Sequence, residues 1–236
     1  MNGRIIDQLS ENIPAGMLNG DLNRWWEILT QHMGSSIVVT SRDGRFLANN
    51  PAAQQSFDPR ADNLIGRTWH DVLPADVADE RLAITQAVLE TGSPTALVGL
   101  IRGRCRCSIF RTANSHGPDM ATVVVICHPL TAFDRQRGLD TANRCQVKIA
   151  ECHDFGPLSE LTEREFEVLT YIGEGLSTAD IAKRLRRSAK TVEWHRGRLG
   201  AKLGAKNRVQ LARIAIQAGL IHLRLLSPRL RVGRGS

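Results

Sequence analysis

The residues of this chain best suited to chemistry are cations gathered near the carboxyl end. Residues 183–213 contain eleven Lys and Arg side chains, and the one acidic residue in this segment is Glu193. The phosphate backbone of nucleic acid attracts such a patch, because binding releases counterions. Residues 156–236 as a whole have sixteen Lys and Arg against seven Asp and Glu, whereas residues 1–155 have fifteen against seventeen. This asymmetry favours nucleic-acid binding, with a solvated surface or an acidic protein partner as alternatives.

A helix predicted over residues 191–203 would present part of this patch to one side. Projected at about 100° per residue, Val192, Leu199 and Leu203 fall on an inward side. The outward side combines cations, a carboxylate, an aromatic and small residues: Lys190, Glu193, Trp194, Gly197, Arg198 and Ala201. This combination suits base edges and phosphates better than a merely solvated face. The sequence therefore predicts a helix that lies in a DNA groove.

Three further predicted helices position this one, and each of the four begins with a side chain that can cap it. The four caps are Thr162, Ser177, Ser188 and Asn207. Glu165 stands three residues after Thr162, which is the spacing of a capping box. Gly175 and Gly219 predict helix ends. Because only Arg186 and Arg187 precede the third cap, the second and third helices are expected to form a helix-turn-helix.

At these positions the chain resembles the LuxR/FixJ-type (GerE-like) DNA-binding domain of bacterial transcription regulators. The matching residues span about sixty positions: Leu161–Glu165, Val168-Leu169, Gly175–Ser177, Ile181-Ala182, Leu185, Ser188, Lys190–Val192, His195-Arg196, Lys202–Gly204 and Gly219-Leu220. The resemblance implies an all-α four-helix domain whose third helix enters the major groove and whose fourth pairs with its twin. It also implies base contacts at Glu193, Trp194 and Gly197. Gly197 and Gly200 depart from the pattern, and close backbone approach, bent DNA or simple tolerance could each account for them.

The expected partners follow from this assignment. We expect DNA contacts from ten residues: Lys190, Thr191, Glu193, Trp194, Gly197, Arg198, Lys202, Arg186, Arg187 and Lys206. We expect dimerisation through an apolar stripe of the fourth helix: Leu211, Ile214, Ala215 and Ala218. The partners are double-stranded DNA, a second copy of the chain and, as a further candidate, RNA polymerase. No catalytic set and no metal site is expected, so the protein is not predicted to be an enzyme.

The N-terminal half reads as an α+β domain. Strands are predicted over 37–40, 46–48, 96–101, 104–111 and 121–128, and helices over 22–33, 52–57, 68–73 and 76–90. Asp43-Gly44 is a hairpin signal between the first two strands. This order resembles a PAS sensory domain, an antiparallel sheet with flanking helices, and Asp43–Arg45, Asn49–Ala52 and Ile65-Gly66 stand at common PAS positions. The resemblance implies a sensory role; no cofactor is predicted, and a small-molecule ligand of unknown identity is left open.

Other functions remain alternatives at this point. Cys105 and Cys107 flank Arg106, which could lower a thiol pKa and support redox sensing, although burial is the commoner fate of cysteine. A sigma-factor-like promoter reader or a protein-interaction module would also use a helical fold. The operator, the signal and the choice between activation and repression are not determined by the sequence.

The expected organisation has five parts. They are a leader at 1–20, a PAS-like domain at 21–130, a partly helical linker at 131–156, the helix-turn-helix domain at 157–223 and a basic disordered tail at 224–236. The chain contains no long apolar run and no signal peptide, and its odd number of cysteines follows no zinc spacing. We therefore expect a cytoplasmic protein with no membrane contact.

Overall fold

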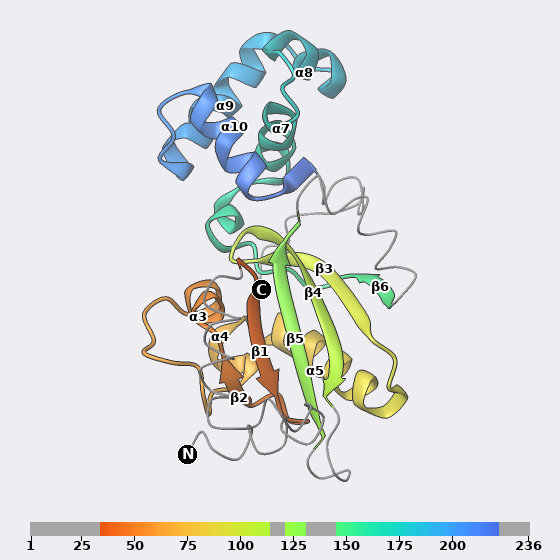
Figure 1. Cartoon of the computed structure of the whole chain (residues 1–236). Helices are drawn as coiled ribbons and strands as arrows, with labels where there is room; N and C mark the ends of the chain where they lie inside the picture. The colour runs from red at the N-terminus through yellow and green to blue at the C-terminus, as the bar shows by residue number, and fades with distance from the viewer. Residues whose placement is uncertain (1–33, 114–120, 131–144, 222–236) are drawn as a thin grey trace. The chain divides into compact units, whose positions relative to one another are not determined.

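A computed structural model describes residues 34–113, 121–130 and 145–221 (Figure 1). These residues fall into two compact units. The first holds most of the described residues up to 148, and the second holds residues 149–221 together with 98–107 and 129–130. Among the described residues, no helix is long and apolar enough to cross a membrane. The helix predicted over 22–33, the leader and the basic tail lie outside the described residues.

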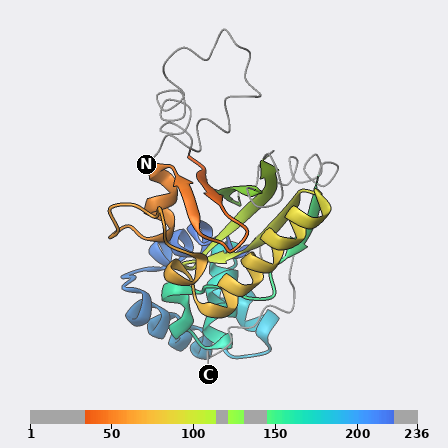
Figure 2. The same cartoon turned by 90° about the horizontal axis from the view of Figure 1, so that it is seen from below.

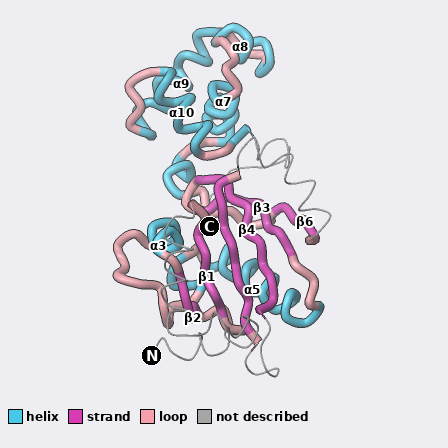
Figure 3. Tube along the Cα trace, viewed as in Figure 1, coloured by secondary structure: helices cyan, strands magenta, loops and turns pink. Residues whose placement is uncertain are grey.

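Six strands of the described part form one sheet in the order β2-β1-β5-β4-β3-β6 (Figure 3). Their bounds are β1 Ser36–Thr40, β2 Phe46–Asn49, β3 Thr95–Ile101, β4 Arg104–Ala113, β5 Thr122–Pro129 and β6 Gln146–Ile149. β1 pairs antiparallel with β2 and with β5, so that Val38 lies opposite both Asn49 and Val125. The five strands predicted from alternation and turn residues are therefore confirmed.

Within the described ranges, three helices accompany the sheet: α3 Pro51–Phe57, α4 Trp69–Val72 and α5 Ala75–Thr91. α5 runs along one face of the sheet (Figures 1 and 2). Asn50 joins β1 to α3, because its side chain accepts hydrogen bonds from the backbone N–H groups of Ile37 and Ala53, both at 2.9 Å. Asn50 is fully buried; these bonds satisfy its Oδ1, and its Nδ2 donates to the Ser35 carbonyl at 3.0 Å.

An aromatic cluster forms the interior beside the β1–β2 hairpin. Trp69 meets Phe46 and Phe57 edge to face at ring-centroid distances of 4.8 and 5.5 Å. The hairpin needs glycine at position 44 for two reasons: its φ is +78°, and a Cβ there would lie 2.9 Å from Cδ1 of Trp69. The Asp43-Gly44 signal thus marks both a turn and a close approach.

β6 differs from the sequence-based expectation, which placed residues 131–156 in a linker. Gln146–Ile149 forms an edge strand beside β3. The Gln146 N–H donates to the Pro94 carbonyl at 2.9 Å, and the Ala150 N–H donates to that of Val98 at 2.8 Å. Because β3 offered an unpaired edge, a four-residue segment with only weak alternation is sufficient to pair with it.

The C-terminal helices are η3 Gly156–Glu160, α7 Glu163–Gly173, α8 Thr178–Leu185, α9 Ala189–Leu203 and α10 Arg208–Gln217. All four predicted N-caps are confirmed. The Thr162, Ser177, Ser188 and Asn207 side chains accept from the backbone N–H three residues later, at 3.3, 3.2, 3.1 and 2.9 Å. Each cap satisfies a backbone donor that the helix itself leaves unpaired.

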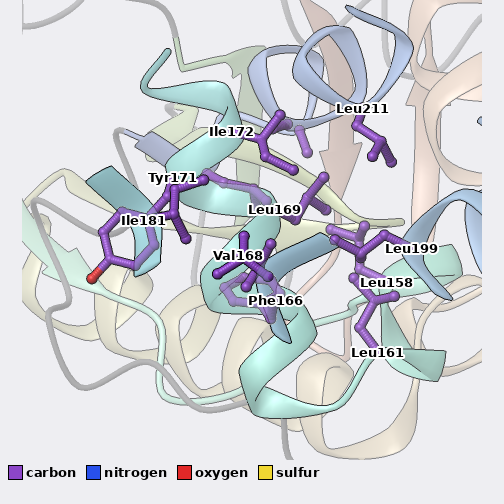
Figure 4. Packing of buried hydrophobic residues seen from close by; sticks show 14 of the residues in the cluster. Leu158, Leu161, Phe166, Val168, Leu169, Tyr171, Ile172, Ile181, Leu199 and Leu211 are labelled. Atoms are coloured by element: carbon purple, nitrogen blue, oxygen red, sulfur yellow. The ribbon is translucent and has the colours of Figure 1, made fainter. Parts of the chain in front are cut away.

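The core of this region is formed where these helices meet. Val168, Leu169, Ile172, Ile181 and Leu199 are almost completely buried there (Figure 4). Val192 is also buried, so the inward side predicted for α9 is confirmed for Val192 and Leu199, and Leu203 lies partly buried against the same cluster. The resulting fold is an α+β PAS-like region followed by an all-α helix-turn-helix region.

Candidate nucleic-acid interface

The outward side of α9 is solvent-exposed, as its periodicity predicts. Lys190, Trp194, Gly197, Arg198 and Ala201 are exposed along the helix. Their positions are fixed from the opposite side, where Val192 and Leu199 are 2% and 0% exposed. The Ser188 cap at one end and the left-handed Gly204, with φ +66°, at the other define where the helix begins and ends.

The connection between α8 and α9 places two arginines at the surface. Arg186 adopts φ +50° and ψ +50°, the left-handed conformation, and caps α8 by donating its backbone N–H to the carbonyls of Ala182 and Lys183. This conformation costs a non-glycine residue about 1 kcal/mol. Both Arg186 and Arg187 are exposed, as is Lys206 beyond α9. These three cations of the sequence-based assignment are therefore on the surface, where a ligand could contact them.

A buried carboxylate organises two of the cations assigned to DNA. Glu165 is 1% exposed and accepts from Arg198 Nε at 2.9 Å and from Lys202 Nζ at 2.6 Å. It also completes the capping box by accepting from the Thr162 N–H at 2.9 Å. Burial raises the pKa of Glu165, but the hydrogen bonds from Lys202, Thr162 and Arg198 outweigh it and lower the pKa to about 2. Glu165 is therefore a carboxylate whose charge is matched within the fold.

Lys202 is better described as an internal partner than as a phosphate contact. Its ammonium group also donates to the Glu160 carbonyl at 2.7 Å, and its side chain is only 22% exposed. Releasing it would leave the buried Glu165 carboxylate with Arg198 as its one remaining cation among the described residues. We therefore revise the assignment of Lys202. Arg198 differs, because its side chain is 48% exposed while it contacts Glu165.

Glu193 is held between α8 and α9. Its Oε1 accepts from Thr178 Oγ1 at 2.8 Å, and its Oε2 pairs with Arg196 Nη2 at 2.6 Å. Thr178 is the first residue of α8, so this contact crosses the helix-turn-helix. Thr191, next to it in the assigned set, is similarly engaged, with its Oγ1 2.9 Å from the Ser188 hydroxyl. Both side chains are oriented before any ligand arrives.

Trp194 is the largest exposed group on the outward side of α9, with 56% of its surface exposed. The guanidinium carbon of Arg198 lies over its ring, 5.0 Å from the centroid. The His195 ring meets it edge to face at 4.8 Å. Burial lowers the pKa of His195 and outweighs the opposing effect of the Glu165 charge, so His195 tends to stay neutral. The indole is thus flanked by two side chains of its own helix.

The two unusual glycines of α9 have different structural reasons. A Cβ on Gly200 would lie 2.7 Å from the Ala205 carbonyl oxygen, which is backbone and cannot move aside cheaply. A Cβ on Gly197 would meet nothing within 4 Å. Gly200 is therefore required by the turn after α9, whereas no packing within the fold requires Gly197.

The stripe of α10 assigned to dimerisation faces the interior of its own domain. Leu211 (Figure 4), Ala215 and Ala218 are 1%, 0% and 4% exposed, and Ile214 is partly buried against the same core. Three of the four side chains therefore have almost no surface to offer a second chain, and the assignment is revised. The exposed apolar residues of α10 are Val209 and Ile216, at 76% and 59%. Their spacing of seven residues places them on one side of the helix.

Sequence reasoning missed the role of Glu165 and the outward side of α10. Glu165 was identified as a cap, but nothing local indicates that Arg198 and Lys202, 33 and 37 residues away, pair with it. The signal for the second was present, because Val209 and Ile216 share a face with Arg213. It was hidden by a stronger apolar stripe on the opposite side of the same helix.

The cysteines of the N-terminal half are placed in the interior. Cys105, Cys107 and Cys127 are 2%, 7% and 1% exposed. Burial raises the pKa of the Cys145 thiol, which opposes formation of a reactive thiolate. Within the described part of the chain, no group of three or more His, Cys, Asp or Glu side chains is arranged to hold a metal ion.

Comparison with known families assigns both regions. Residues 159–215 match the model described as bacterial regulatory proteins, luxR family, and residues 30–135 match the PAS fold. The chain therefore carries a luxR-family helix-turn-helix domain and, before it, a PAS domain.

Two curated relatives match a short part of the chain. Protein Mb0914c of Mycobacterium bovis, named as an HTH-type transcriptional regulator, is 48% identical over 59 residues, which is 25% of this chain and 7% of that protein. The oxygen regulatory protein NreC of Staphylococcus aureus is 37% identical over 65 residues, 28% of this chain and 30% of that protein. The chain thus spans less than a third of the length of these relatives.

Solved structures show more extensive but weaker likeness. The Vibrio cholerae VqmA–ligand–DNA complex is 22% identical, with coverage of 86% of this chain and 90% of that one, and a TM-score of 0.45. The PAS domain of Bordetella pertussis BvgS is 18% identical, with coverage of 52% and 98% and a TM-score of 0.39.

Proposed function

We propose that this protein is a transcription regulator that binds double-stranded DNA sequence-specifically, with α9 in the major groove. The observation that carries the proposal is the outward side of α9, where Lys190, Trp194 and Arg198 are exposed within a strongly cationic region. The luxR-family match over residues 159–215 supports it.

The arrangement separates phosphate binding from base recognition. Arg186 and Arg187 at the turn, Lys190 in the first turn of α9 and Lys206 after it are exposed cations placed around the helix. In the proposed complex they hold phosphates and fix the register of α9. Trp194 and Glu193, near the middle of the exposed side, then face base edges. Arg198 belongs to both groups, since it lies over Trp194 and is half-exposed.

We propose further that the protein binds as a dimer to a two-fold site through α10. Val209 and Ile216 are large apolar side chains exposed on a helix whose other side is buried. Apolar surface of this kind gains free energy when a second copy covers it. Pairing two DNA-binding domains also raises apparent affinity without any new contact to DNA. Contact with RNA polymerase stays a prediction.

Selection of bound sequences from a random duplex pool by the full chain tests this function. We expect an enriched site with two inverted half-sites and an affinity that falls steeply with salt. Recovery of unselected sequences, together with no measurable binding to any duplex at low salt, would contradict the proposal. In that case the cationic surface would belong to an acidic protein partner.

The PAS region is proposed to control DNA binding by taking up a small molecule. Trp69 Nε1 and Thr40 Oγ1 are buried and lack a hydrogen-bond partner among the described residues. A ligand with acceptor atoms would satisfy them, and unsatisfied buried polar groups are costly. Mass spectrometry of small molecules released on denaturing the purified chain tests this, with Trp69→Phe as the variant that keeps the ring but lacks the N–H. Release of nothing from the original protein would instead favour a partner-binding surface.

A further inference from the structure

The exposed side of α9 has an unusual composition around Trp194. Lys190, Trp194, Gly197 and Ala201 follow one another at helical spacing of four, three and four residues. Beyond Trp194 this line carries no side chain larger than a methyl group. The space where a Cβ of Gly197 would lie is open. The indole is therefore the group that projects from the middle of this surface, and it stands beside a part of the helix where DNA can approach the backbone closely.

The indole is held in place by a chain of contacts that begins in the core. Glu165, almost fully buried, is fixed by the Thr162 N–H and by Lys202. It accepts from Arg198 Nε at 2.9 Å, and the Arg198 guanidinium then lies over the Trp194 ring. Arg198 therefore contacts the buried carboxylate of Glu165 and the exposed ring of Trp194 at the same time. A group fixed in this way loses little conformational entropy on binding.

We infer that Trp194 is a specificity-determining residue that reads the C5-methyl group of a thymine, and that Arg198 is the positioning residue that holds the indole for this contact. The inference rests on the proposed DNA binding by α9. A half-exposed indole has a large apolar surface, and the only apolar group that base edges present in the major groove is the thymine methyl. The Lys and Arg side chains of this surface already supply hydrogen-bond donors. An apolar side chain adds a contact to a methyl group, which these cations cannot make.

The test replaces thymine by deoxyuridine, one position at a time, in the duplex obtained by selection from the random pool. This change removes one methyl group and leaves base pairing and charge intact. Binding of the full chain is measured by fluorescence anisotropy. We expect the wild-type protein to lose about three- to fivefold in affinity at one thymine of each half-site, the value of one buried methyl. We expect Trp194→Ala to bind the thymine and deoxyuridine duplexes equally.

Three further variants separate the roles. Trp194→Phe keeps an aromatic ring but lacks the indole N–H, so it should retain the discrimination; a Trp194→Ala variant that retains it as well would overturn the methyl contact. Arg198→Ala should reduce the thymine preference, and Arg198→Lys should restore part of it. Lys190→Ala, a matched change of an exposed cation on the same side, should weaken binding to both duplexes equally. Circular dichroism confirms that each variant is folded.

The outcomes test the thymine-methyl contact separately from the proposed DNA binding. If the wild-type protein binds a selected site but no deoxyuridine substitution affects it, the methyl contact is wrong and the proposed function stands. If Arg198→Ala weakens every duplex equally and keeps the thymine preference, Arg198 is a phosphate contact rather than a positioning residue. If the wild-type protein binds no duplex at low salt, the proposed function itself fails.

Discussion

At the scale of single residues, Glu165 links the fold to the candidate interface. It caps α7, and its buried carboxylate accepts from two cations of α9. Removing one member of such a buried group leaves the others without compensation, so its effect exceeds that of a surface ion pair. The charge of Glu165 is therefore required both for stability and for the position of Arg198.

We predict a specific acid sensitivity from this carboxylate. Its folded-state pKa is lowered from 4.5 to about 2, so its contribution is fully present above pH 4.5 and is lost as the pH falls toward 2. The contribution is on the order of 3 kcal/mol. Urea unfolding followed by circular dichroism across this range should show a steep decline in the wild-type protein and a flatter one in Glu165→Gln.

The effect of His195 falls in a different pH window. Burial lowers its pKa below 6.5, so its contribution begins to be lost as the pH falls below 6.5. For the lower window, the contrary outcome is a Glu165→Gln variant whose free energy of unfolding declines between pH 4.5 and 2 as steeply as that of the wild type. Other carboxyl groups would then account for the acid sensitivity. His195→Gln, which should alter only the upper window, is the control.

The two glycines of α9 give a matched pair of predictions. Gly197→Ala should raise the free energy of unfolding by up to about 1 kcal/mol, because alanine favours a helix and meets nothing there. Gly200→Ala should lower it by about 1–3 kcal/mol, because the new methyl would collide with the Ala205 carbonyl. Thermal or urea unfolding measures both. Equal effects of the two changes would contradict the different reasons given for the two residues.

At the scale of elements, the α8–α9 turn places an arginine, Arg186, in a left-handed backbone conformation that favours glycine. Glycine would adopt the left-handed conformation of Arg186 freely, yet an arginine stands there. We predict that Arg186→Gly changes the free energy of unfolding by less than about 1 kcal/mol but weakens DNA binding at every sequence. Anisotropy titrations and urea unfolding of the same preparation measure the two effects. A large loss of stability would show that the side chain serves the fold.

The two sides of α10 should respond differently to substitution. Leu211→Ala should lower the free energy of unfolding by about 2–5 kcal/mol, because it leaves a cavity in the core. Val209→Glu with Ile216→Glu should leave the fold stable, since both residues are exposed. The double variant should bind a two-fold site much more weakly than the wild type, yet bind a single half-site with equal affinity. Equal binding of both proteins to the two-fold site would move the dimer contact elsewhere.

At the scale of the whole molecule, charge is divided unequally along the chain. The excess of cations lies in residues 156–236, whereas residues 1–155 have a slight excess of carboxylates. We predict that the logarithm of the DNA association constant falls linearly with the logarithm of salt concentration, by about 0.9 for each phosphate contacted. Lys190→Ala and Arg187→Ala should each reduce the steepness of this slope by about 0.9, the value for one lost phosphate contact. An unchanged slope in both variants would remove these residues from the phosphate contacts.

Local sequence was sufficient for much of this structure. Helix starts, glycine ends, the inward and outward sides of α9 and most strands were predicted, because caps and amphipathic periods involve residues only a few positions apart. The class of protein followed from the same short segments. Most of the ten candidate DNA contacts are exposed, whereas Lys202 is engaged by Glu165, and their binding to DNA stays a prediction.

Tertiary structure decided what no short segment contains. α10 is apolar on two sides, and only the neighbouring helices determine that Leu211 is buried while Val209 and Ile216 are exposed. β6 forms because β3 has a free edge, and Glu165 selects Arg198 and Lys202 from a helix that begins more than twenty residues later. Long-range pairing depends on which surfaces the fold brings together. For that reason the sequence by itself determined the helix proposed to meet DNA, while the fold determined which of its cations remain exposed.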